Sequence, residues 1–372
     1  MSALNVLVVG GGVGGMSAAI QLARQGAEVE LIDIDPDWKV YGAGITITGP
    51  TLRAFRTLGV LDEVAQAGFC SHGIRVFTQD GRRLGEVPAP QLEPGIPSQG
   101  GIMRPLLHKI LSTRTLQAGA RVRLGLTVEH IGQDGQGVDV RFSDGGEGRY
   151  DLVIGADGAY SKVRDLLFPT APKPEPTGQG CWRMTTARPP EVDWSEFYAG
   201  GKVRAGVTPC SQAQMYLFAL MPVGGEDWID PEVWPDRLRE ALQGFRGTVA
   251  KVRDAIGPDS FINYRPLASA IAPRPWRNGR VALIGDAVHA TTPHLASGAG
   301  MAVEDAIVLA YELAARPGVE DALDAYEERR FERCRLVVDA SRRLGEIELA
   351  RGSEHEHQAL RMTATQALAA PI

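Results

Sequence analysis

The sequence has little of what characterises nucleic-acid-binding and membrane proteins. Its 372 residues include 39 Lys and Arg against 45 Asp and Glu, which gives a formal net charge of −6. The excess of positive charge that neutralises nucleic-acid phosphates is therefore missing. No stretch approaches the roughly 18 consecutive apolar residues of a membrane-spanning helix. We expect neither a nucleic-acid partner nor a membrane span.

Cysteine is scarce as well. The chain has four, Cys70, Cys181, Cys210 and Cys334, and none belongs to a C-x-x-C pair. This spacing favours neither a zinc site nor a disulfide framework, so we expect no metal and a reduced, cytoplasmic setting. The N-terminal apolar run breaks at once into glycines, which is typical of a buried strand rather than a signal peptide.

Aromatic residues are few, whereas glycine is abundant. Aromatic residues make up 6% of the chain, and glycines number 44. Abundant glycine favours tight turns and close approaches of the backbone to a ligand. Hydrophobic residues make up 44%, which excludes disorder as the main state. The length exceeds that of one simple core and predicts about two folded units.

A strand, a helix and a second strand open the chain. Residues 4–9 are a Val-rich apolar run, residues 13–25 have apolar and small residues at helical spacing, and residues 29–32 are again apolar. This order is a βαβ unit and predicts a parallel sheet. Two further apolar runs, 152–154 and 281–284, predict buried strands of the same kind.

Residues 71–96 and about 179–268 have a different pattern. They contain alternating strand-like pieces, such as 74–78 and 215–220, separated by loops rich in Pro and Gly. We interpret these two segments as a second, largely antiparallel layer.

The chain is helical in pattern from about Ala302 onward. Pro317-Gly318 separates a helix ending near Ala315 from a long one over about 320–351. The last 20 residues carry no pattern that we can assign.

Three glycines between the first strand and the first helix fit G-x-G-x-x-G. Gly10 permits a tight turn, Gly12 lets the backbone approach a pyrophosphate, and Gly15 lets the helix pack on the strand. Asp33 ends the second strand, where a carboxylate accepts hydrogen bonds from ribose hydroxyls. The alternative is that these glycines serve only as turn residues. The order of strand, glycines, helix, strand and acidic residue favours dinucleotide binding instead.

Two further segments decide which dinucleotide. Residues 151–164 read D-L-V-I-G-A-D-G-A-Y-S-K-V-R, and residues 279–306 read G-R-V-A-L-I-G-D-A-V-H-A-T-T-P-H-L-A-S-G-A-G-M-A-V-E-D-A. With the glycine fingerprint, these segments resemble the class A flavin-dependent aromatic hydroxylases, which include 4-hydroxybenzoate, salicylate and urate hydroxylases. The resemblance runs from about residue 4 to about residue 330.

The resemblance implies an α/β fold with a Rossmann-like FAD-binding domain, built on a parallel sheet, and a mostly antiparallel substrate domain followed by C-terminal helices. We expect the domains to divide as follows: 1–70, 97–178 and 269–330 for FAD binding, 71–96 and 179–268 for the substrate layer, and 331–372 for a C-terminal helical segment.

The resemblance also implies a set of site residues. The residues expected to bind the cofactor are Gly10, Gly12, Gly14, Gly15, Asp33, Ala43, Arg104, Val128, Asp157, Asp286, Gly298, Ala299 and Gly300. The residues expected at the reacting ring are Pro293, Arg204 and Tyr216. Other pocket candidates by position are Trp182, Arg183, Met215 and Phe218.

Several of these residues have a structural alternative. Arg204 could be a solvated strand residue, and Tyr216 could simply pack in the sheet. Asp157-Gly158 is also a turn signal, and Ser161 is a plausible N-cap for a helix over 162–167. His289 and His294 are more typical of structural histidines than of catalysts.

The chain departs from the family pattern at two places. Asp33 stands where the family usually has Glu followed by a basic residue, and here Ile34 follows. Residues 296–300 read Ala-Ser-Gly-Ala-Gly, where the family often has Gly-Gln-Gly-x-Asn. The second segment is closer to the loop of salicylate hydroxylases, but it does not assign salicylate as the substrate.

The implied function is that of an FAD-containing monooxygenase that consumes NAD(P)H and O2. A flavin C4a-hydroperoxide would hydroxylate a small aromatic or heteroaromatic substrate. Only one glycine fingerprint is present, so NAD(P)H is expected to bind transiently. Two alternatives stay open, a reductase or dehydrogenase on the same fold and a non-catalytic flavin-binding redox module. The sequence is compatible with a monomer or a homodimer.

Overall fold

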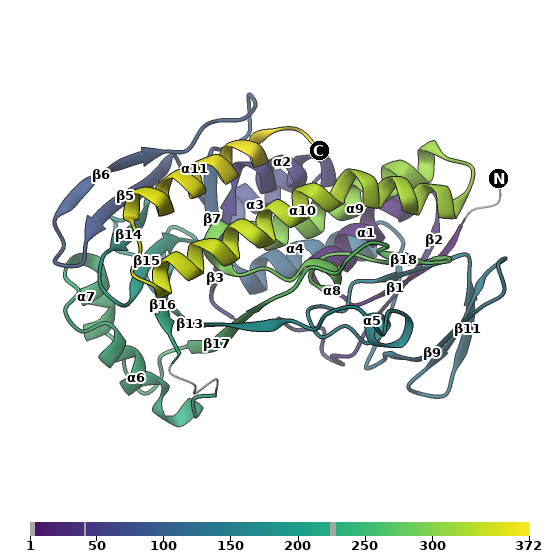
Figure 1. Cartoon of the computed structure of the whole chain (residues 1–372), viewed down its shortest axis with the longest axis horizontal. Coiled ribbons are helices and arrows are strands. Elements are labelled where there is room, and N and C mark those ends of the chain that lie inside the picture. The colour runs from purple at the N-terminus through teal and green to yellow at the C-terminus, as the bar shows by residue number, and fades with distance from the viewer. Residues whose placement is uncertain (1–3, 41, 224–227) are drawn as a thin grey trace.

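The N-terminal apolar run forms a central strand of a six-stranded sheet in the computed structural model, which describes residues 4–40, 42–223 and 228–372 (Figure 1). The strand order is β18-β19-β12-β1-β2-β8. The strands are β1 (Asn5–Val9), β2 (Glu28–Asp33), β8 (Arg121–Leu124), β12 (Leu152–Gly155), β18 (Arg277–Asn278) and β19 (Val281–Leu283). All neighbouring pairs are parallel except β18 with β19, so the predicted parallel sheet is confirmed.

Helices cover this sheet because its strands are apolar on both faces. Val6, Leu7 and Val8 of β1 are fully buried. α1 and α9 pack on each other, and α9 packs in turn on α2 and α10. The helices of this part are α1 (Val13–Arg24), α2 (Gly49–Leu58), α3 (Leu61–Ala67), α4 (Arg104–Gln117), α5 (Lys162–Leu167), α8 (Asp286–His289), α9 (Gly298–Ala315) and α10 (Val319–Leu349).

A seven-stranded sheet forms the second layer. Its strand order is β17-β13-β16-β15-β14-β5-β6, and only the pairing of β14 with β5 is parallel. The strands are β5 (Gly73–Thr78), β6 (Arg83–Pro88), β13 (Glu175–Ala187), β14 (Ser195–Ala199), β15 (Arg204–Pro209), β16 (Gln214–Pro222) and β17 (Ile262–Ser269). The predicted, largely antiparallel layer is therefore confirmed.

Two small sheets flank the larger ones. One has the order β11-β10-β9 and the other β3-β7-β4. Their strands are β9 (Val128–Gln133), β10 (Val138–Phe142) and β11 (Glu147–Tyr150), and β3 (Gly44–Thr48), β4 (Phe69–Ser71) and β7 (Gln99–Met103). The β3-β7-β4 sheet lies against β15 and β16 of the seven-stranded sheet and also packs on α2 and α4.

The side chains of β13 and β16 alternate between two environments. Trp182 and Met184 of β13 and Leu217 of β16 lie in an apolar core, which α6 (Trp234–Ala241) and α7 (Gly247–Asp254) cover. Their chain neighbours, such as Arg183 and Phe218, face a cavity instead. Trp182 and Met215, two of the pocket candidates, are therefore core residues, whereas Arg183 and Phe218 reach the cavity.

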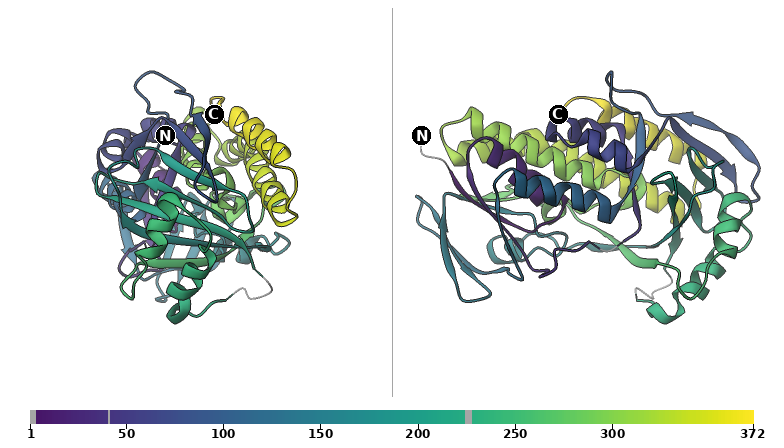
Figure 2. Two further views of the ribbon diagram at one scale, coloured as in Figure 1. Left: turned by 90° about the vertical axis from the view of Figure 1, so that its left-hand side faces the viewer. Right: turned by 180° about the vertical axis from the view of Figure 1, so that it is seen from behind.

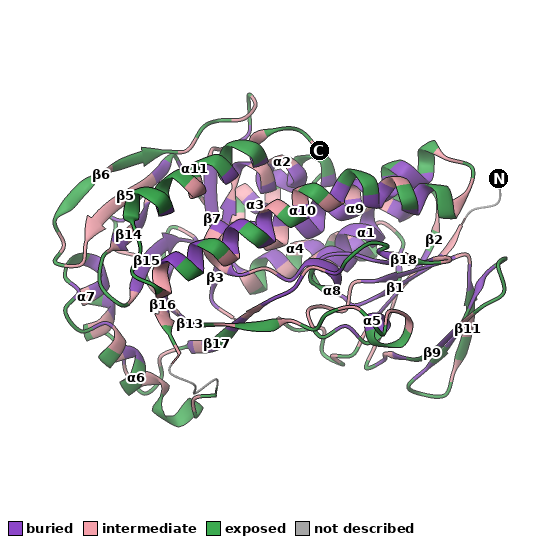
Figure 3. Cartoon of the chain, viewed as in Figure 1, coloured by how far each residue is buried: buried purple, intermediate pink, exposed green. Residues whose placement is uncertain are grey.

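Long elements run from one large sheet to the other. α10 packs on α9 at one end and on β13 and the short helix η2 (Pro293–Leu295) at the other. Figure 2 shows α10 running lengthwise beside α9, and Figure 3 shows buried residues along both of these helices. The expected boundary between residues 330 and 331 falls inside α10.

The last residues form a helix, α11 (Glu354–Ala369), which the sequence pattern left unassigned. It packs on α10 and α2. A 3-10 turn, η1 (Pro231–Val233), precedes α6. None of the helices in the described ranges combines the length and apolar character needed to cross a lipid bilayer. All four cysteines are free thiols.

Close packing explains two of the fingerprint glycines. Gly10 has a φ of +107°, and a Cβ there would overlap the carbonyl of Ala156, the residue that follows β12. A Cβ at Gly15 would overlap the Gly10 carbonyl oxygen and press on Val8. The predicted roles of Gly10 in the turn and of Gly15 in helix–strand packing are thus confirmed.

Gly15→Ala is expected to destabilise the fold, because its methyl group overlaps backbone that cannot move without separating α1 from β1. The free energy of unfolding, measured by urea denaturation, should fall by about 3 kcal/mol. Gly85→Ala, in β6, is the control, because a Cβ there meets no atom within 4 Å. Equal stability of the two variants would contradict the packing argument.

Candidate active site

A cavity of about 500 Å³ lies where the two large sheets meet. It is lined by the first turn of α1, the loop after β19, the first turn of α9 and the inner faces of β13, β14 and β16. Of the expected site residues, the cavity brings together Gly12, Gly14, Arg104, Tyr216, Asp286, Pro293, Gly298 and Ala299.

Gly12 opens onto this cavity. It is the N-cap of α1, and a Cβ built there meets no protein atom within 4 Å. Its backbone has a φ of −76°, which any residue adopts. Neither packing nor backbone conformation of the protein therefore requires glycine at this position. The free N–H groups and positive dipole end of α1 face the same space.

Asp286 and Arg104 provide opposite charges on the cavity wall. Asp286 follows β19 directly and is exposed to the cavity, yet the surrounding protein raises the pKa of its carboxyl through desolvation. Arg104 opens α4. Burial lowers the pKa of its guanidinium, and the nearby Arg183 adds to this effect. Arg104 and Arg183 both face the cavity. Among the described residues, no carboxylate oxygen lies within 4.0 Å of a nitrogen of either guanidinium.

The start of α9 forms another part of the wall. Gly298 and Ala299 line the cavity, together with Pro293 in η2. The side chain of the N-cap residue, Ser297, accepts no hydrogen bond from the first turn of this helix, so it leaves the N–H groups there uncapped. Gly300 has a different function, since a Cβ there would overlap the hydroxyl of Thr51 in α2. It permits close packing of α9 on α2.

Two expected cofactor residues lie outside the cavity lining and form local contacts. Asp33 accepts hydrogen bonds from the backbone N–H of Gly11 (2.6 Å) and of Asp35 (2.7 Å). Asp157 accepts from the backbone N–H of Lys162 and Val163 at the start of α5. The N-cap of α5 is Ser161, as predicted, and its hydroxyl accepts from the Arg164 N–H. Asp33 still ends β2 at the carboxyl edge of the sheet, beside the glycine turn.

Two others are buried. Val128 is 0% exposed at the start of β9, and Ala43 is 0% exposed beneath Arg104, whose backbone N–H donates to the Ala43 carbonyl (3.2 Å). Any cofactor contact by these two residues would be made by their backbone rather than by their side chains.

Arg204 is placed differently from the expectation. It lies on β15 with 8% exposure, but it is not among the cavity-lining residues. Its Nε lies 3.4 Å from a carboxylate oxygen of Glu348, and its Nη2 pairs with Glu354 of α11. Its positive charge thus pairs with carboxylates of α10 and α11. The sequence had not predicted contacts between these helices and β15.

Tyr216 belongs to a row of hydroxyl groups. Its hydroxyl lies 2.7 Å from Thr46 Oγ1, which in turn lies 3.2 Å from Thr208 Oγ1. Burial raises the pKa of the Tyr216 phenol, so it keeps its proton. Gly44 permits this arrangement, because a Cβ there would overlap the Tyr216 ring.

Sequence reasoning missed a group of cavity residues near the C-terminus. Glu348 of α10 and His357 and Arg361 of α11 all line the cavity, beside His294. One readable signal was present: Ser353 and Glu356 form the S-x-x-E pattern of a helix start, and the Ser353 hydroxyl accepts from the Glu356 N–H. That pattern would have predicted α11 but not the direction of its side chains.

A family model described as an FAD binding domain matches residues 3–341. The chain belongs to this FAD-binding family. It is 34% identical over 355 residues to aurachin C monooxygenase/isomerase of Stigmatella aurantiaca, covering 92% of this chain and 89% of that protein. It is 32% identical over 355 residues to 3-amino-4-hydroxybenzoate 2-monooxygenase PtmB3 of Streptomyces platensis, covering 91% and 87%.

The fold is also that of a solved flavoprotein. Klebsiella pneumoniae HpxO, in a structure complexed with FAD and uric acid, has a TM-score of 0.88 and 24% identity, with 98% of this chain and 96% of that chain covered. The predicted membership of the FAD-dependent aromatic hydroxylase family is confirmed. The relatives have different compounds in their names, so the comparisons do not assign one substrate to this chain.

The cavity residues fit FAD. Gly12 leaves open space at a helix N-terminus, which suits a pyrophosphate. Asp286 offers a carboxylate acceptor, and Arg104 a cation without a carboxylate partner in the described residues. These are the donor and acceptor types that a phosphate-bearing, hydroxylated cofactor requires.

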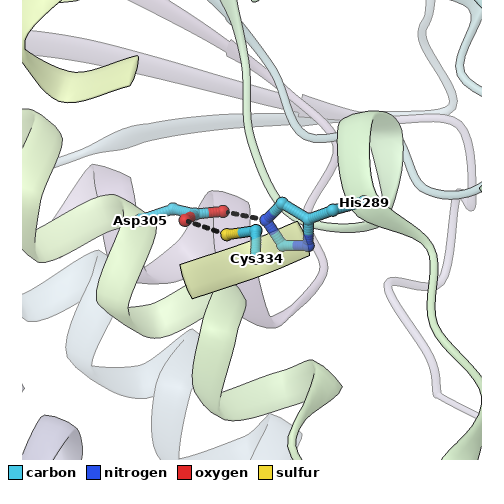
Figure 4. A group of neighbouring side chains, drawn as sticks. All are labelled: His289, Asp305 and Cys334. Atoms are coloured by element: carbon cyan, nitrogen blue, oxygen red, sulfur yellow. Dashed lines mark hydrogen bonds and ion pairs between the residues drawn. The ribbon is translucent and has the colours of Figure 1, made fainter. Parts of the chain in front are cut away.

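A second cluster, His289, Asp305 and Cys334, has its ligand atoms within 4.8 Å of one another (Figure 4). Internal hydrogen bonds already use the carboxylate. Asp305 accepts from His289 Nε2 (2.6 Å), from Arg330 Nε (2.7 Å) and from the Gly285 N–H (2.8 Å). Because the guanidinium of Arg330 is part of the cluster, its chemistry is that of a buried ion-pair network rather than of a cation site.

The charge of Asp305 stabilises the folded state. Burial by itself raises the pKa of the carboxyl, but His289 and Arg330 outweigh it and the net pKa is lowered. His289 is the partner in this pair, and its pKa is raised well above its ordinary value. The contribution of Asp305 is thus present above its ordinary pKa and is lost as the pH falls toward the folded value.

Asp305→Asn is expected to lower the free energy of unfolding by about 3–5 kcal/mol, because Arg330 and His289 then lack their buried counter-charge. Urea denaturation at pH 7 measures this loss. The control is Asp339→Asn, since Asp339 is an exposed carboxylate of α10. A variant as stable as the control would contradict the assignment of a stabilising ion-pair network.

Proposed function

We propose that the chain is an FAD-dependent monooxygenase that uses NAD(P)H and O2 to hydroxylate a small aromatic or heteroaromatic compound. The observation that carries the proposal is the continuity of one cavity. It joins the glycine turn of α1, Asp286 and the start of α9 to a chamber of mixed apolar and polar residues. A cofactor and a small ring bound there would be in contact.

The cofactor side would be held by residues of four elements. We assign the pyrophosphate to Gly12 and Gly14 and the N-terminus of α1, the ribityl hydroxyls to Asp286, and a phosphate or ribityl oxygen to Arg104. When bound, FAD would supply electron transfer from NAD(P)H and the activation of O2. Gly10, Gly15, Gly300 and Asp157 support this side by packing and by hydrogen bonds to the start of α5, and Asp33, Ala43 and Val128 lie outside the cavity lining.

The start of α9 would stabilise negative charge. Gly298 and Ala299 present backbone N–H groups and the positive end of an 18-residue helix to the cavity. An anionic ring system next to this helix end would be favoured over a neutral one. Pro293 holds the adjoining turn, where its fixed φ leaves little freedom to the loop.

The other end of the cavity would position the substrate ring and exclude water. Ile45, Phe197 and Phe218 provide apolar surface there. The Tyr216 phenol keeps its proton and could donate it in a hydrogen bond to a ring oxygen, with Thr46 fixing its orientation. Arg204 orients α10 and α11 through Glu348 and Glu354, which makes it a positioning residue in this proposal.

The proposal is tested with the purified protein. Its visible spectrum should be that of a flavin, and NADH or NADPH should reduce the flavin anaerobically, faster when one class of phenol, pyridine or purine is present. Oxygen should then yield a product that contains one atom of ¹⁸O from ¹⁸O2. Fast reduction that no ring compound alters, with peroxide as the only oxygen product, would instead support a reductase or dehydrogenase. A protein that never binds flavin would overturn the proposal.

Gly12→Val is expected to block FAD binding without unfolding the protein. The new side chain meets no protein atom at its Cβ and has an accessible φ, so it occupies only the space proposed for the pyrophosphate. Flavin content should fall by at least about tenfold, equivalent to 1.4 kcal/mol of binding, while the melting temperature of the flavin-free proteins stays the same. Gly85→Val is the control with full flavin content. Normal flavin content in Gly12→Val would remove this glycine from the site.

Cytoplasmic location and a monomeric or homodimeric state stay predictions of the sequence.

A further inference from the structure

The C-terminal helix α11 forms one wall of the cavity. His357 and Arg361, one helical turn apart, line it. Both ends of α11 are held: Glu354 pairs with Arg204 of β15, and Arg53 of α2 donates to the carbonyls of Ala369 (2.8 Å) and Ala370 (2.6 Å). The two side chains are therefore presented by an anchored element rather than by a loose tail.

Glu348 is already saturated by partners other than Arg361. Its carboxylate lies 2.9 Å from His357 Nε2, 3.2 Å from His294 Nε2 and 2.9 Å from the amide nitrogen of Gln179. Arg204 Nε adds an ion pair at 3.4 Å. Burial raises the pKa of this carboxyl, but His294 and His357 outweigh that effect and the net pKa is lowered. Its negative charge is shared among these four groups.

Arg361 has a positive charge with no carboxylate of its own. Within the ranges that the structure describes, no Asp or Glu oxygen lies within 4.0 Å of its guanidinium. The guanidinium lies over the Phe197 ring, 5.8 Å from its centroid. Desolvation lowers its pKa, and Glu348 only partly offsets this. Arg361 is only partly exposed. A partly desolvated guanidinium without a counter-charge is unfavourable, and an anion bound in the cavity would compensate it.

The surroundings of Arg361 match one ligand chemistry. Phe197 and Phe218 are stacked aromatic rings at 6.4 Å on the same wall, and they suit the face of a planar ring. The planar fork of a guanidinium matches a carboxylate with two parallel hydrogen bonds. Arg183, a second cavity arginine, lies close to Arg104, on the side that we assign to the cofactor.

Resting on the proposed function, we propose that Arg361 is a specificity-determining residue that binds a carboxylate on the ring substrate. The substrate class is then aromatic carboxylates, with the ring against Phe197 and Phe218 and the carboxylate at α11. Neither the glycine fingerprint nor the motifs at 151–164 and 279–306 include α11, so this specificity is separate from the features common to the family.

Calorimetric titration of the FAD-loaded full chain, with no NAD(P)H present, tests the proposal. The probes are 2-hydroxybenzoate and 4-hydroxybenzoate, each against its carboxamide, which has nearly the same shape but no charge. At least one carboxylate should bind about tenfold or more tightly than its amide, because a charged hydrogen-bonded pair adds that much affinity. Equal affinities, or no binding of either carboxylate, would overturn the proposal.

Substitution of Arg361 tests whether this residue causes the preference for the carboxylate over the amide. Arg361→Gln should weaken carboxylate binding about tenfold and leave amide binding within about twofold, whereas Arg335→Gln, an exposed arginine of α10, should change neither. If the carboxylate preference survives in Arg361→Gln, the assignment to Arg361 is wrong. Should Arg361→Gln not fold, Arg361→Lys keeps the charge but loses the fork; it should lose part of the preference, and an unchanged preference would count against the assignment.

The proposed function and the inference about Arg361 can be contradicted independently of each other. Carboxylate binding that depends on Arg361, in a protein that does not oxidise NAD(P)H with O2, would contradict the proposed function and keep the binding site. Hydroxylation of aromatic carboxylates with unchanged kinetics in Arg361→Gln would support the proposed function and overturn the inference about Arg361.

Discussion

The buried carboxylate of Asp305 holds together the elements that form the proposed cofactor side of the cavity. It accepts from the Gly285 N–H, which directly precedes Asp286, and from His289 at the other end of the same short helix. Arg330 of α10 neutralises it from the opposite side and also pairs with Glu304. Because a buried charge needs its partners, this network sets the positions of the loop after β19, of α9 and of α10 together.

A second ionic network lies further along the same helix. Glu348 lies 18 residues after Arg330 on α10, a separation of about 27 Å along a helix. At one end α10 orients the loop that carries Asp286, and at the other it orients His294, Arg204 and, through His357, the helix α11. A single rigid helix thereby links the proposed cofactor and substrate ends of one cavity, so that neither end can shift without disturbing buried charges.

Much of the fold could be predicted from local patterns. The βαβ unit, the buried strands at 152–154 and 281–284, the helix break at Pro317-Gly318 and the antiparallel layer all follow from hydrophobic period and turn residues, which act over short stretches of chain. Asp286, Gly12 and Pro293 reach the cavity because their motifs lie at the carboxyl ends of parallel strands, where connecting turns gather at one edge of the sheet.

What the sequence by itself determined is therefore the fold class, the family and the residues of the proposed cofactor side, since these depend on residues that are close together in the chain. Only the tertiary structure decided the proposed substrate side. Arg204 and Arg361 carry the same charge, but Arg204 is used by Glu348 and Glu354, and Arg361 is left facing the cavity. Which of two arginines is paired depends on contacts between residues about 150 positions apart, as Arg204 and Glu354 show, and no local pattern contains them.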